Sequence, residues 1–339
     1  MSVNTFDEKY EIRLACYDEI AEIMTFIDTY WRKNHLMARN RSLFEYEFVV
    51  DGRVNVVIAK ERTSGAIHGI QGFLQASKDS SQLDAWGSIW KVIPGASGLL
   101  GIEIVKRLHS LVGIRSFLLI GANPKTAVPI YKRIMRYQDT GKMQHYYCLA
   151  KRDKYHICQA AHYEPCESST DCRTEVIPLK NMDELRQTYN FSYSAEAYPY
   201  KDEWYINHRY FAHPIYSYQI YGLRQNGETQ ALLICREQAY GEAKALRVVD
   251  YIGKKSLFAG LNRFWQEKLH TYEYVDMYAY GFEESYIQAS GMIKVRDNDT
   301  NIIPNYFTPY VAENIDIWVC SPNGKAVFFK ADGDQDRPN

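Results

Sequence analysis

Residues 86–101 read WGSIWKVIPGASGLLG, an apolar run that leads into a turn in which glycine recurs. Apolar residues then continue at helical spacing to Val112, and a second apolar run spans Phe117–Ile120. Strand, turn, helix and strand in this order predict a βαβ unit with a right-handed crossover. The helix should bury one apolar stripe, made of Leu100, Ile104, Leu108 and Leu111.

The turn that precedes this helix is a candidate anion site. The first N–H groups of a helix have no intrahelical partner, and the positive end of the helix dipole lies beside them. The amides that could hold phosphate belong to Gly95, Ser97, Gly98 and Gly101. A plain turn whose glycines serve only tight geometry would show the same spacing, so both interpretations stand on the glycines alone.

The next segment, residues 121–141, reads GANPKTAVPIYKRIMRYQDTG. It follows the strand 117–120 and opens a short helix that should present Ala127, Ile130 and Ile134 on one face. With the preceding strand, turn and helix, the pattern from Asn123 to Tyr131 resembles the GNAT superfamily of acyl-CoA N-acyltransferases. Two departures from that pattern are Leu99, where a glycine is expected, and Met135, which replaces another glycine.

The resemblance implies acetyl-CoA as co-substrate. The turn would bind the CoA pyrophosphate, and the backbone of residues 89–92 would hold the pantetheine and polarise the thioester carbonyl. Tyr131 would protonate the departing thiolate. The implied cofactor-binding residues are Trp90, Val92, Gly95, Ser97, Gly98, Gly101 and Asn123.

Composition bounds the class of protein. The chain has 339 residues, 46% of them hydrophobic, which is enough for two cores. A formal net charge of −1 argues against a general nucleic-acid binder. The apolar runs are too short to span a bilayer, and the first residues are polar. We therefore expect a cytoplasmic protein with no nucleic-acid or membrane partner.

Seven cysteines at irregular spacing favour reduced thiols over a disulfide framework. Cys158, His162, Cys166 and Cys172 include metal-ligand residue types in a short span, but their spacing matches no zinc pattern. A polar linker is the favoured interpretation, and no metal site is expected.

The pattern of the first lobe restarts in the second half of the chain. A strand at 10–16, a helix at 18–31 and a hairpin of 54–60 with 67–75 open the first lobe, and residues 34–48 form a short helix or a substrate-facing loop. Strands at 175–179, 216–222, 230–237, 245–251 and 274–280, with helices at 183–189 and 256–272, follow the polar stretch 148–174.

We therefore predict an α/β (α+β) fold with two lobes, each a mixed central sheet flanked by helices. The predicted limits are 1–150 for the acyl-CoA lobe, 151–174 for a connector and 175–339 for a diverged lobe that binds the second substrate. The second copy lacks the glycine-rich turn, so only the first lobe should bind CoA.

The second lobe supplies most candidates for binding the acyl acceptor. Its aromatic side chains could stack on a nucleobase or a sugar, although most tyrosines are expected to pack on strands. The aspartates of the C-terminus do not complete a calcium loop, and an arginine among them could pair with a phosphate or carboxylate. The candidates are Arg209, His213, Arg247, Asp250, Asp276, Asn305, Asp334, Asp336 and Arg337.

Together with Asn34-His35, these blocks look like tandem-GNAT proteins of bacterial surface-polysaccharide (O-antigen or capsule) biosynthesis. That resemblance implies transfer of an acetyl group to the amine of a nucleotide-linked amino sugar, with UDP as the expected nucleotide. His35 is the leading candidate base because a neutral imidazole suits amine deprotonation. The alternative is that His35 has a structural role, with its hydrogen bonds made inside the protein or at its surface. Asp84 or an acid of the second lobe would serve equally as the base.

Two other functions fit the same pattern. One is a two-lobed aminoacyl-tRNA-dependent transferase of the peptidoglycan-bridge type, and the other is a non-catalytic carbohydrate-binding protein on a GNAT scaffold. The sequence leaves the sugar, the position of its amine, the acyl chain and the oligomeric state open.

Overall fold

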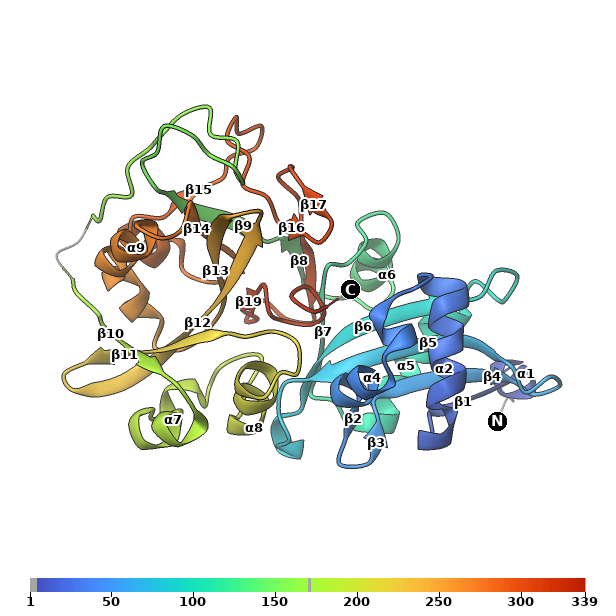
Figure 1. Cartoon of the computed structure of the whole chain (residues 1–339). Coiled ribbons are helices and arrows are strands. Elements are labelled where there is room, and N and C mark those ends of the chain that lie inside the picture. Colours follow the sequence, from blue (N-terminus) through green and yellow to red (C-terminus); the bar gives the residue numbers. More distant parts are fainter. Residues whose placement is uncertain (1–4, 170–171, 339) are drawn as a thin grey trace.

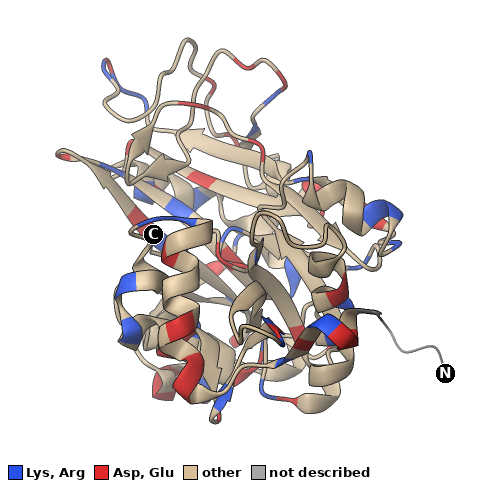
Figure 2. Ribbon diagram, turned by 90° about the vertical axis from the view of Figure 1, so that its right-hand side faces the viewer, with Lys and Arg blue, Asp and Glu red and all other residues tan. Residues whose placement is uncertain are grey.

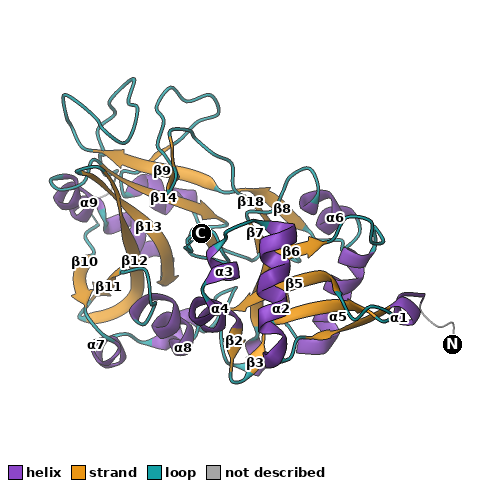
Figure 3. Ribbon diagram, turned by 45° about the vertical axis from the view of Figure 1, so that its right-hand side comes forward, coloured by secondary structure: helices purple, strands orange, loops and turns teal. Residues whose placement is uncertain are grey.

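The computed structural model describes residues 5–169 and 172–338, which form two lobes, each built on one large sheet (Figure 1). Helices pack against both sheets, as Figure 3 shows. The predicted fold class, two mixed α/β lobes, is confirmed.

The first sheet has the strand order β1-β4-β5-β6-β7-β18-β8. Its strands are β1 (Tyr10–Leu14), β4 (Val56–Glu61), β5 (Ile67–Gln75), β6 (Asp84–Val92), β7 (Ser116–Ile120), β18 (Trp318–Ser321) and β8 (Asp139–Lys142). Strands β4, β5 and β6 pair antiparallel, whereas β6 and β7 are parallel and are joined by helix α5 (Leu100–Val112). The predicted βαβ unit is therefore present.

Helices cover both faces of this sheet. Ile23 of α2 (Ile20–Phe26) shares one apolar cluster with Ile70 of β5, and Leu108 of α5 shares another with Phe73 of the same strand. Side chains of a strand alternate between faces, so α2 and α5 lie on opposite sides. The remaining described elements of this half are α1 (Thr5–Lys9), two 3-10 turns (Tyr17–Glu19 and Ser80–Gln82), a π-helical turn (Ile27–Trp31), α3 (Leu36–Arg39), α4 (Arg41–Phe48), β2 (Val49–Val50), β3 (Arg53–Val54) and α6 (Ala127–Arg133).

The second sheet has the strand order β10-β11-β12-β13-β14-β9-β15, with β19 beside β14. Its strands are β10 (Glu175–Leu179), β11 (Gln219–Gln225), β12 (Glu228–Tyr240), β13 (Ala243–Gly253), β14 (Tyr274–Tyr280), β9 (Gln144–Leu149), β15 (Ile293–Lys294) and β19 (Phe328–Phe329). Four helices, α7 (Met182–Thr188), α8 (Glu203–Ile206), α9 (Asn262–Leu269) and α10 (Glu284–Ala289), and the ribbon of β16 (Tyr306–Phe307) with β17 (Tyr310–Val311) belong to this half.

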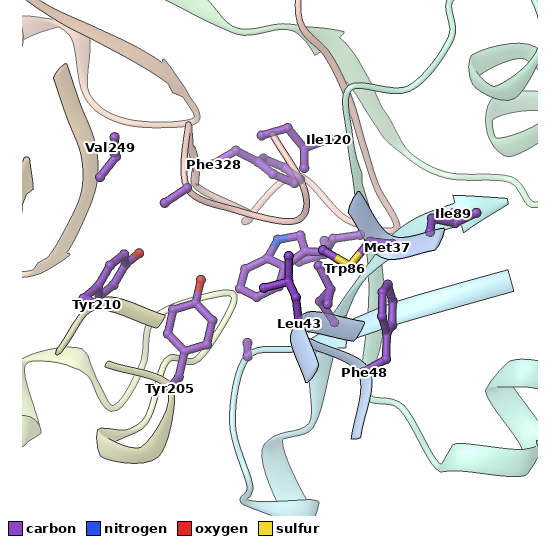
Figure 4. Close-up of a cluster of buried hydrophobic side chains, with 14 of the residues drawn as sticks. Met37, Leu43, Phe48, Trp86, Ile89, Ile120, Tyr205, Tyr210, Val249 and Phe328 are labelled. Atoms are coloured by element: carbon purple, nitrogen blue, oxygen red, sulfur yellow. The ribbon is translucent and has the colours of Figure 1, made fainter. Parts of the chain in front are cut away.

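The two sheets exchange strands across the predicted lobe limits. Strand β9 precedes residue 150 but pairs with β14 in the second sheet, and β18 follows residue 175 but lies between β7 and β8 in the first. The lobes also share a core. In Figure 4, Met37, Leu43 and Trp86 of the first lobe meet Tyr205 and Phe328 of the second. The predicted lobe boundaries, at residues 150 and 175, stay a prediction. Each sheet nevertheless includes a strand from beyond the boundary predicted for its lobe.

Several local predictions are wrong in detail. Leu111 is 42% exposed and lies in the last turn of α5, which ends at Val112 before a left-handed Gly113. Helix α6 buries Val128 and Tyr131 rather than the predicted face, and Ile134 is exposed. The predicted helix 256–272 is divided into a 3-10 segment at 255–260 and α9.

The expectation of reduced thiols is wrong for one pair of cysteines. Cys148 on β9 forms a disulfide with Cys166, with the two Cα atoms 5.5 Å apart. Both side chains lie in the apolar cluster of the second lobe. The pair therefore ties the stretch between the lobes to the second sheet.

Strands β6 and β7 separate soon after they meet. They pair only from Asp84 with Ser116 to Trp86 with Leu118, although β6 continues to Val92. At the next residue, Gly87, a Cβ atom would lie 2.6 Å from Leu119 and 2.9 Å from Phe117. A side chain is thus excluded at the point where the strands diverge.

We predict that Gly87→Ala lowers the free energy of unfolding by about 1–3 kcal/mol, because the added methyl overpacks this point. Gly324→Ala is the control, since a Cβ there meets nothing within 4 Å. Urea denaturation measures both. Equal stability of the two variants would contradict the close packing at Gly87.

Candidate functional site

A cavity of about 340 Å³ lies between the lobes. Its wall in the first lobe includes His35, Glu47 and two consecutive residues of β6, Ser88 and Ile89. The C-terminal tail, residues 330–338, lies between the lobes in Figure 1, and several of its residues from Asp334 to Pro338 contribute to the other side of the cavity. A cavity between two lobes, with convergent polar groups, is the default binding site of such a fold.

A bulge in β6 explains why two neighbouring residues face the same cavity. Gln71 of β5 is opposite Trp90, but Phe73 is opposite Gly87, so β6 carries one extra residue here. A bulge redirects side chains that would otherwise alternate. Ser88 and Ile89 consequently both line the cavity.

The backbone of β6 offers an edge to a ligand. Beyond Trp86, none of its described residues pairs with β7, while the other edge pairs with β5 as far as Val92. Unpaired backbone groups at such an edge can bind an extended chain. The predicted holding role of residues 89–92 is compatible with this geometry and stays a prediction.

The turn after β6 is open. Gly95 has a φ of 83°, and a Cβ at Gly95 or Gly98 would meet nothing within 4 Å. Leu99, at the N-cap of α5, makes no side-chain cap hydrogen bond. Gly101 differs, because Trp90 packs 3.1 Å from its Cβ position and donates to its carbonyl oxygen over 3.3 Å. The open part of the turn is therefore residues 95–99.

Asn123 and Tyr131 both contribute to the packing of α6. The Asn123 carboxamide oxygen accepts hydrogen bonds from the amides of Lys125 (2.9 Å) and Thr126 (3.2 Å). Tyr131 is fully buried, and its ring lies 5.8 Å from Trp90. Within the described residues its hydroxyl has no hydrogen-bond partner, and burial raises its pKa well above the ordinary value. The proposed acid role stays a prediction.

His35 lines the cavity and caps a helix. Its Nδ1 accepts a hydrogen bond of 3.2 Å from the Met37 amide at the start of α3. An acceptor at Nδ1 places the proton of the neutral ring on Nε2. The other candidate base, Asp84, lies elsewhere, fully buried beside Arg115, whose Nε donates to it over 2.9 Å.

Asp334 brings a carboxylate into the same cavity. The Ser88 hydroxyl donates to its Oδ2 over 3.3 Å, and the Gln335 amide donates to its Oδ1 over the same distance. Burial raises the pKa of Asp334, although Arg337 nearby opposes the shift. A carboxylate with a raised pKa, next to an unpaired strand edge, is suited to accept a proton.

The tail is fixed to the first lobe by a buried ion pair. Arg337 Nε lies 2.7 Å from Glu47 Oε2 on α4, and His213 Nε2 is 3.4 Å from the other oxygen. Burial alone would raise the pKa of Glu47, but Arg337 holds it well below its usual range. His213 Nδ1 accepts from the amide of Tyr216 over 2.9 Å, so this histidine supports a turn.

A second set of charges fixes the tail to the second lobe. Arg236 Nε is 3.0 Å from Asp336 Oδ1, and Arg209 Nη2 donates to the Asp336 carbonyl over 2.6 Å. Burial would raise the pKa of Asp336, but Arg236 and Arg209 lower it to about 2. Arg209 also donates to Tyr218, and it is 1% exposed. Its contacts are therefore structural.

Arg247 and Asp276 form a third buried pair, on adjacent strands β13 and β14. Arg247 Nη2 is 2.6 Å from Asp276 Oδ2, and Nη1 donates to the Asn305 carbonyl over 2.8 Å. His145 Nε2 is 3.0 Å from the same carboxylate. Arg247 and Asn305 face a second cavity, whereas Asp276 lies behind them.

Asp250, a predicted binding residue, belongs to another network. Lys201 Nζ lies 2.7 Å from Asp250 and 2.7 Å from Asp332 of the tail, and Tyr210 donates to Asp250. Burial raises the pKa of Asp332 to about 6 despite the lysine. These groups hold the tail beneath the site and do not line either cavity.

The structure thus brings His35, Asp334 and Arg337 together in the first cavity, and Arg247, Asn305 and Asp336 near it. Sequence reasoning missed the partners Glu47, Lys201, Arg236 and Lys330. Glu47 lies in the segment predicted to be a short helix or a substrate-facing loop, and Lys330 lies just before the C-terminal aspartates, but neither has a local signal of burial. The C-terminal tail is packed into the protein rather than solvated, since Asp332 is fully buried.

Figure 2 shows acidic and basic residues interspersed along the helices and loops of the chain. Among residues 5–169 and 172–338, no group of three or more His, Cys, Asp or Glu side chains is placed to hold a metal ion. None of the helices in those ranges is long and apolar enough to cross a membrane.

We predict that Asp336→Asn lowers the free energy of unfolding by about 3–5 kcal/mol at pH 7, because buried arginines lose their counter-charge. Because the pKa of about 2 lies below the unfolded value, the stability from Asp336 is present above about pH 4. It is lost as the pH falls toward 2, so wild type and variant should converge there.

Denaturant unfolding between pH 2 and 7 measures this difference. Asp297→Asn, at an exposed site, is the control and should leave stability unchanged. A difference between wild type and Asp336→Asn that does not depend on pH would contradict the role of the carboxylate.

No protein-family model matches the sequence, and no curated protein shows detectable similarity to it. The chain is similar in structure to a GCN5-related N-acetyltransferase from Anabaena variabilis ATCC 29413, with a TM-score of 0.54 at 10% identity over 93% of this chain and 73% of the other. A probable N-acyltransferase from Enterococcus faecalis V583 gives a TM-score of 0.54 at 8% identity over 91% and 72%. The chain therefore has the fold that the resemblance to the GNAT superfamily implied.

Proposed function

We propose that this protein is an acyl-CoA-dependent N-acyltransferase that acetylates the amine of a nucleotide-linked amino sugar. One observation carries the proposal: the unpaired edge of β6 leads from the cavity at Ser88 and Ile89 to the open turn at the start of α5. An extended pantetheine can follow that edge, while its phosphates meet the helix N-terminus. The fold is that of a structure named as an N-acetyltransferase, which supports the reaction class.

The reaction requires a base, an oxyanion site and an acid. The amine nitrogen attacks the thioester carbonyl carbon and loses its proton to Asp334, which lies beside Ser88 in the cavity. Backbone N–H groups of residues 89–92 stabilise the oxyanion. The C–S bond then breaks, and Tyr131, whose hydroxyl has no partner among the described residues, gives its proton to the thiolate.

The sugar nucleotide is the proposed acceptor because the resemblance to surface-polysaccharide enzymes favours it and because the cavity offers matching groups. Tyr306 and Arg337 line the cavity and can contact a ring and a phosphate. UDP is the expected nucleotide, and O-antigen or capsule biosynthesis is the expected setting.

A thiol-release assay tests the proposal directly. Acetyl-CoA is offered with UDP-linked amino sugars and with the same free amino sugars, and products are identified by mass spectrometry. Release of CoA with a UDP-linked amine is the expected result. If CoA is released no faster with the protein than without it, whichever acceptor is offered, the assignment as an enzyme is contradicted.

Two variants decide whether Asp334 or His35 is the general base. We predict that Asp334→Asn lowers kcat by about 10²–10⁴-fold. His35→Asn should lower it much less, since asparagine keeps the helix cap and removes only the imidazole. The rates are measured with saturating acetyl-CoA. The reverse order of effects would make His35 the base.

Tyr131→Phe tests the acid. We predict a lower kcat, with acetyl-CoA affinity and thermal midpoint nearly unchanged, because the hydroxyl makes no hydrogen bond within the described residues. Calorimetry and a thermal melt accompany the rate measurement. Tyr137→Phe is the control, because that hydroxyl donates to the Phe117 carbonyl over 2.6 Å and its loss should affect stability. Unchanged turnover in Tyr131→Phe would remove the acid role.

A further inference from the structure

A second cavity of about 280 Å³ adjoins the first. The two share Tyr306, Thr308 and part of the tail, including Arg337. The second is lined in addition by Lys330 and Asn305. A molecule whose amine lies in the first cavity can therefore extend into the second.

Lys330 is a buried cation without a partner. The residue is 2% exposed, and among the described residues its Nζ has no hydrogen bond. The rings of Tyr278 and Tyr306 lie 5.8 Å and 5.6 Å from it. Rings alone do not replace the hydration of a buried ammonium, so the position is costly for the folded protein. Burial, with a contribution from Arg247, lowers the pKa of Lys330 to about 7.

Asn305 supplies a second donor without an acceptor. Its Oδ1 accepts a hydrogen bond of 3.2 Å from Arg247 Nη1, which fixes the orientation of the amide. The Nδ2 group is then left as a buried donor, and it has no partner among the described residues. Unsatisfied buried donors are rare, and two that line one cavity indicate a missing acceptor.

Among the described residues, the ammonium group of Lys330 is the positive charge in the wall of this cavity that lacks a carboxylate partner. Each arginine that lines the cavity pairs with a carboxylate, whereas Lys330 forms no ion pair with any of the described residues. The three arginine pairs are Arg236 with Asp336, Arg247 with Asp276 and Arg337 with Glu47.

We infer that the second cavity binds an oxyanion of the acceptor substrate, a phosphate or carboxylate, through Lys330 Nζ and Asn305 Nδ2. A bound oxyanion would supply the acceptor for both donors and the counter-charge for the lysine. The assignment to the acceptor substrate rests on the proposed function, but binding of the anion does not.

Anion binding is measured by calorimetry on the full chain without acetyl-CoA, so turnover plays no part. UDP and glucuronate are the probes, and they distinguish a phosphate from a carboxylate site. Saturable binding of at least one of them is expected. Failure of both to bind would overturn the inference, whereas failure of the thiol-release assay would affect only the proposed reaction.

Lys330→Met should weaken binding of the preferred probe by about 10–100-fold and raise the thermal midpoint of the protein without ligand. The rise is expected because methionine removes an unpaired buried charge. Lys151→Met removes an exposed lysine and should change neither quantity. Wild-type affinity in Lys330→Met would overturn the assignment.

Asn305→Asp is a second variant that keeps the shape of the side chain. Its carboxylate would lie beside Arg247, in the wall of the cavity that Lys330 also lines, and would supply the negative charge in place of the oxyanion. Binding should therefore be lost while the fold remains. Retained binding of the probe in this folded variant would also overturn the inference.

Sulfate, whose charge is constant, tests the lysine by pH. Affinity should be constant below about pH 7 and fall above it, because the free lysine loses its proton there. The titratable groups near Lys330 keep their charge as the pH rises above 7. The pKa values of Asp336 and Asp276 are lowered by their arginine partners, and those of Tyr278 and Tyr306 are raised by burial. Burial lowers the pKa of His145, which stacks on Tyr278, so this imidazole is already neutral there. Constant affinity from pH 6 to 9 would exclude Lys330 as the ligand.

Discussion

The C-terminal tail is buried between the lobes, and its contacts fix how the two lobes and the cavities are arranged. Asp332, Asp334 and Asp336 alternate along the tail, and each meets a different partner: Lys201, Ser88 and Arg236. A carboxylate taken out of water is tolerated only where such partners exist. The tail can therefore lie in one position only, and that position forms the walls of both cavities.

The same constraint joins the lobes into one unit. Strand β9 pairs within the second sheet and β18 within the first, so the chain crosses between the lobes and back. Trp86 and Phe328 belong to one apolar cluster that spans both lobes. A site between the lobes is thus held by covalent connection, by ion pairs and by a shared core. Such rigid support is what precise positioning of two substrates requires.

Much of the fold followed from local patterns. The βαβ unit around α5 and the strands β10 and β14 were predictable because hydrophobic periodicity is a local property. The strand exchange was not, because β9 and β14 are neighbours in space but far apart in sequence. Some site residues could likewise be chosen from the sequence, and others could not. Asp334 and Arg337 stood out in the tail, whereas Glu47 and Lys330 became significant only through burial and through the partners they have or lack.

We propose that the unpaired edge of β6 and the open turn after it hold acyl-CoA. Amide hydrogen exchange of the full chain, measured with and without acetyl-CoA, tests this binding mode. We expect slower exchange in the peptides that cover residues 87–101 when acetyl-CoA is present. No change in those peptides, or protection confined to the second lobe, would contradict it.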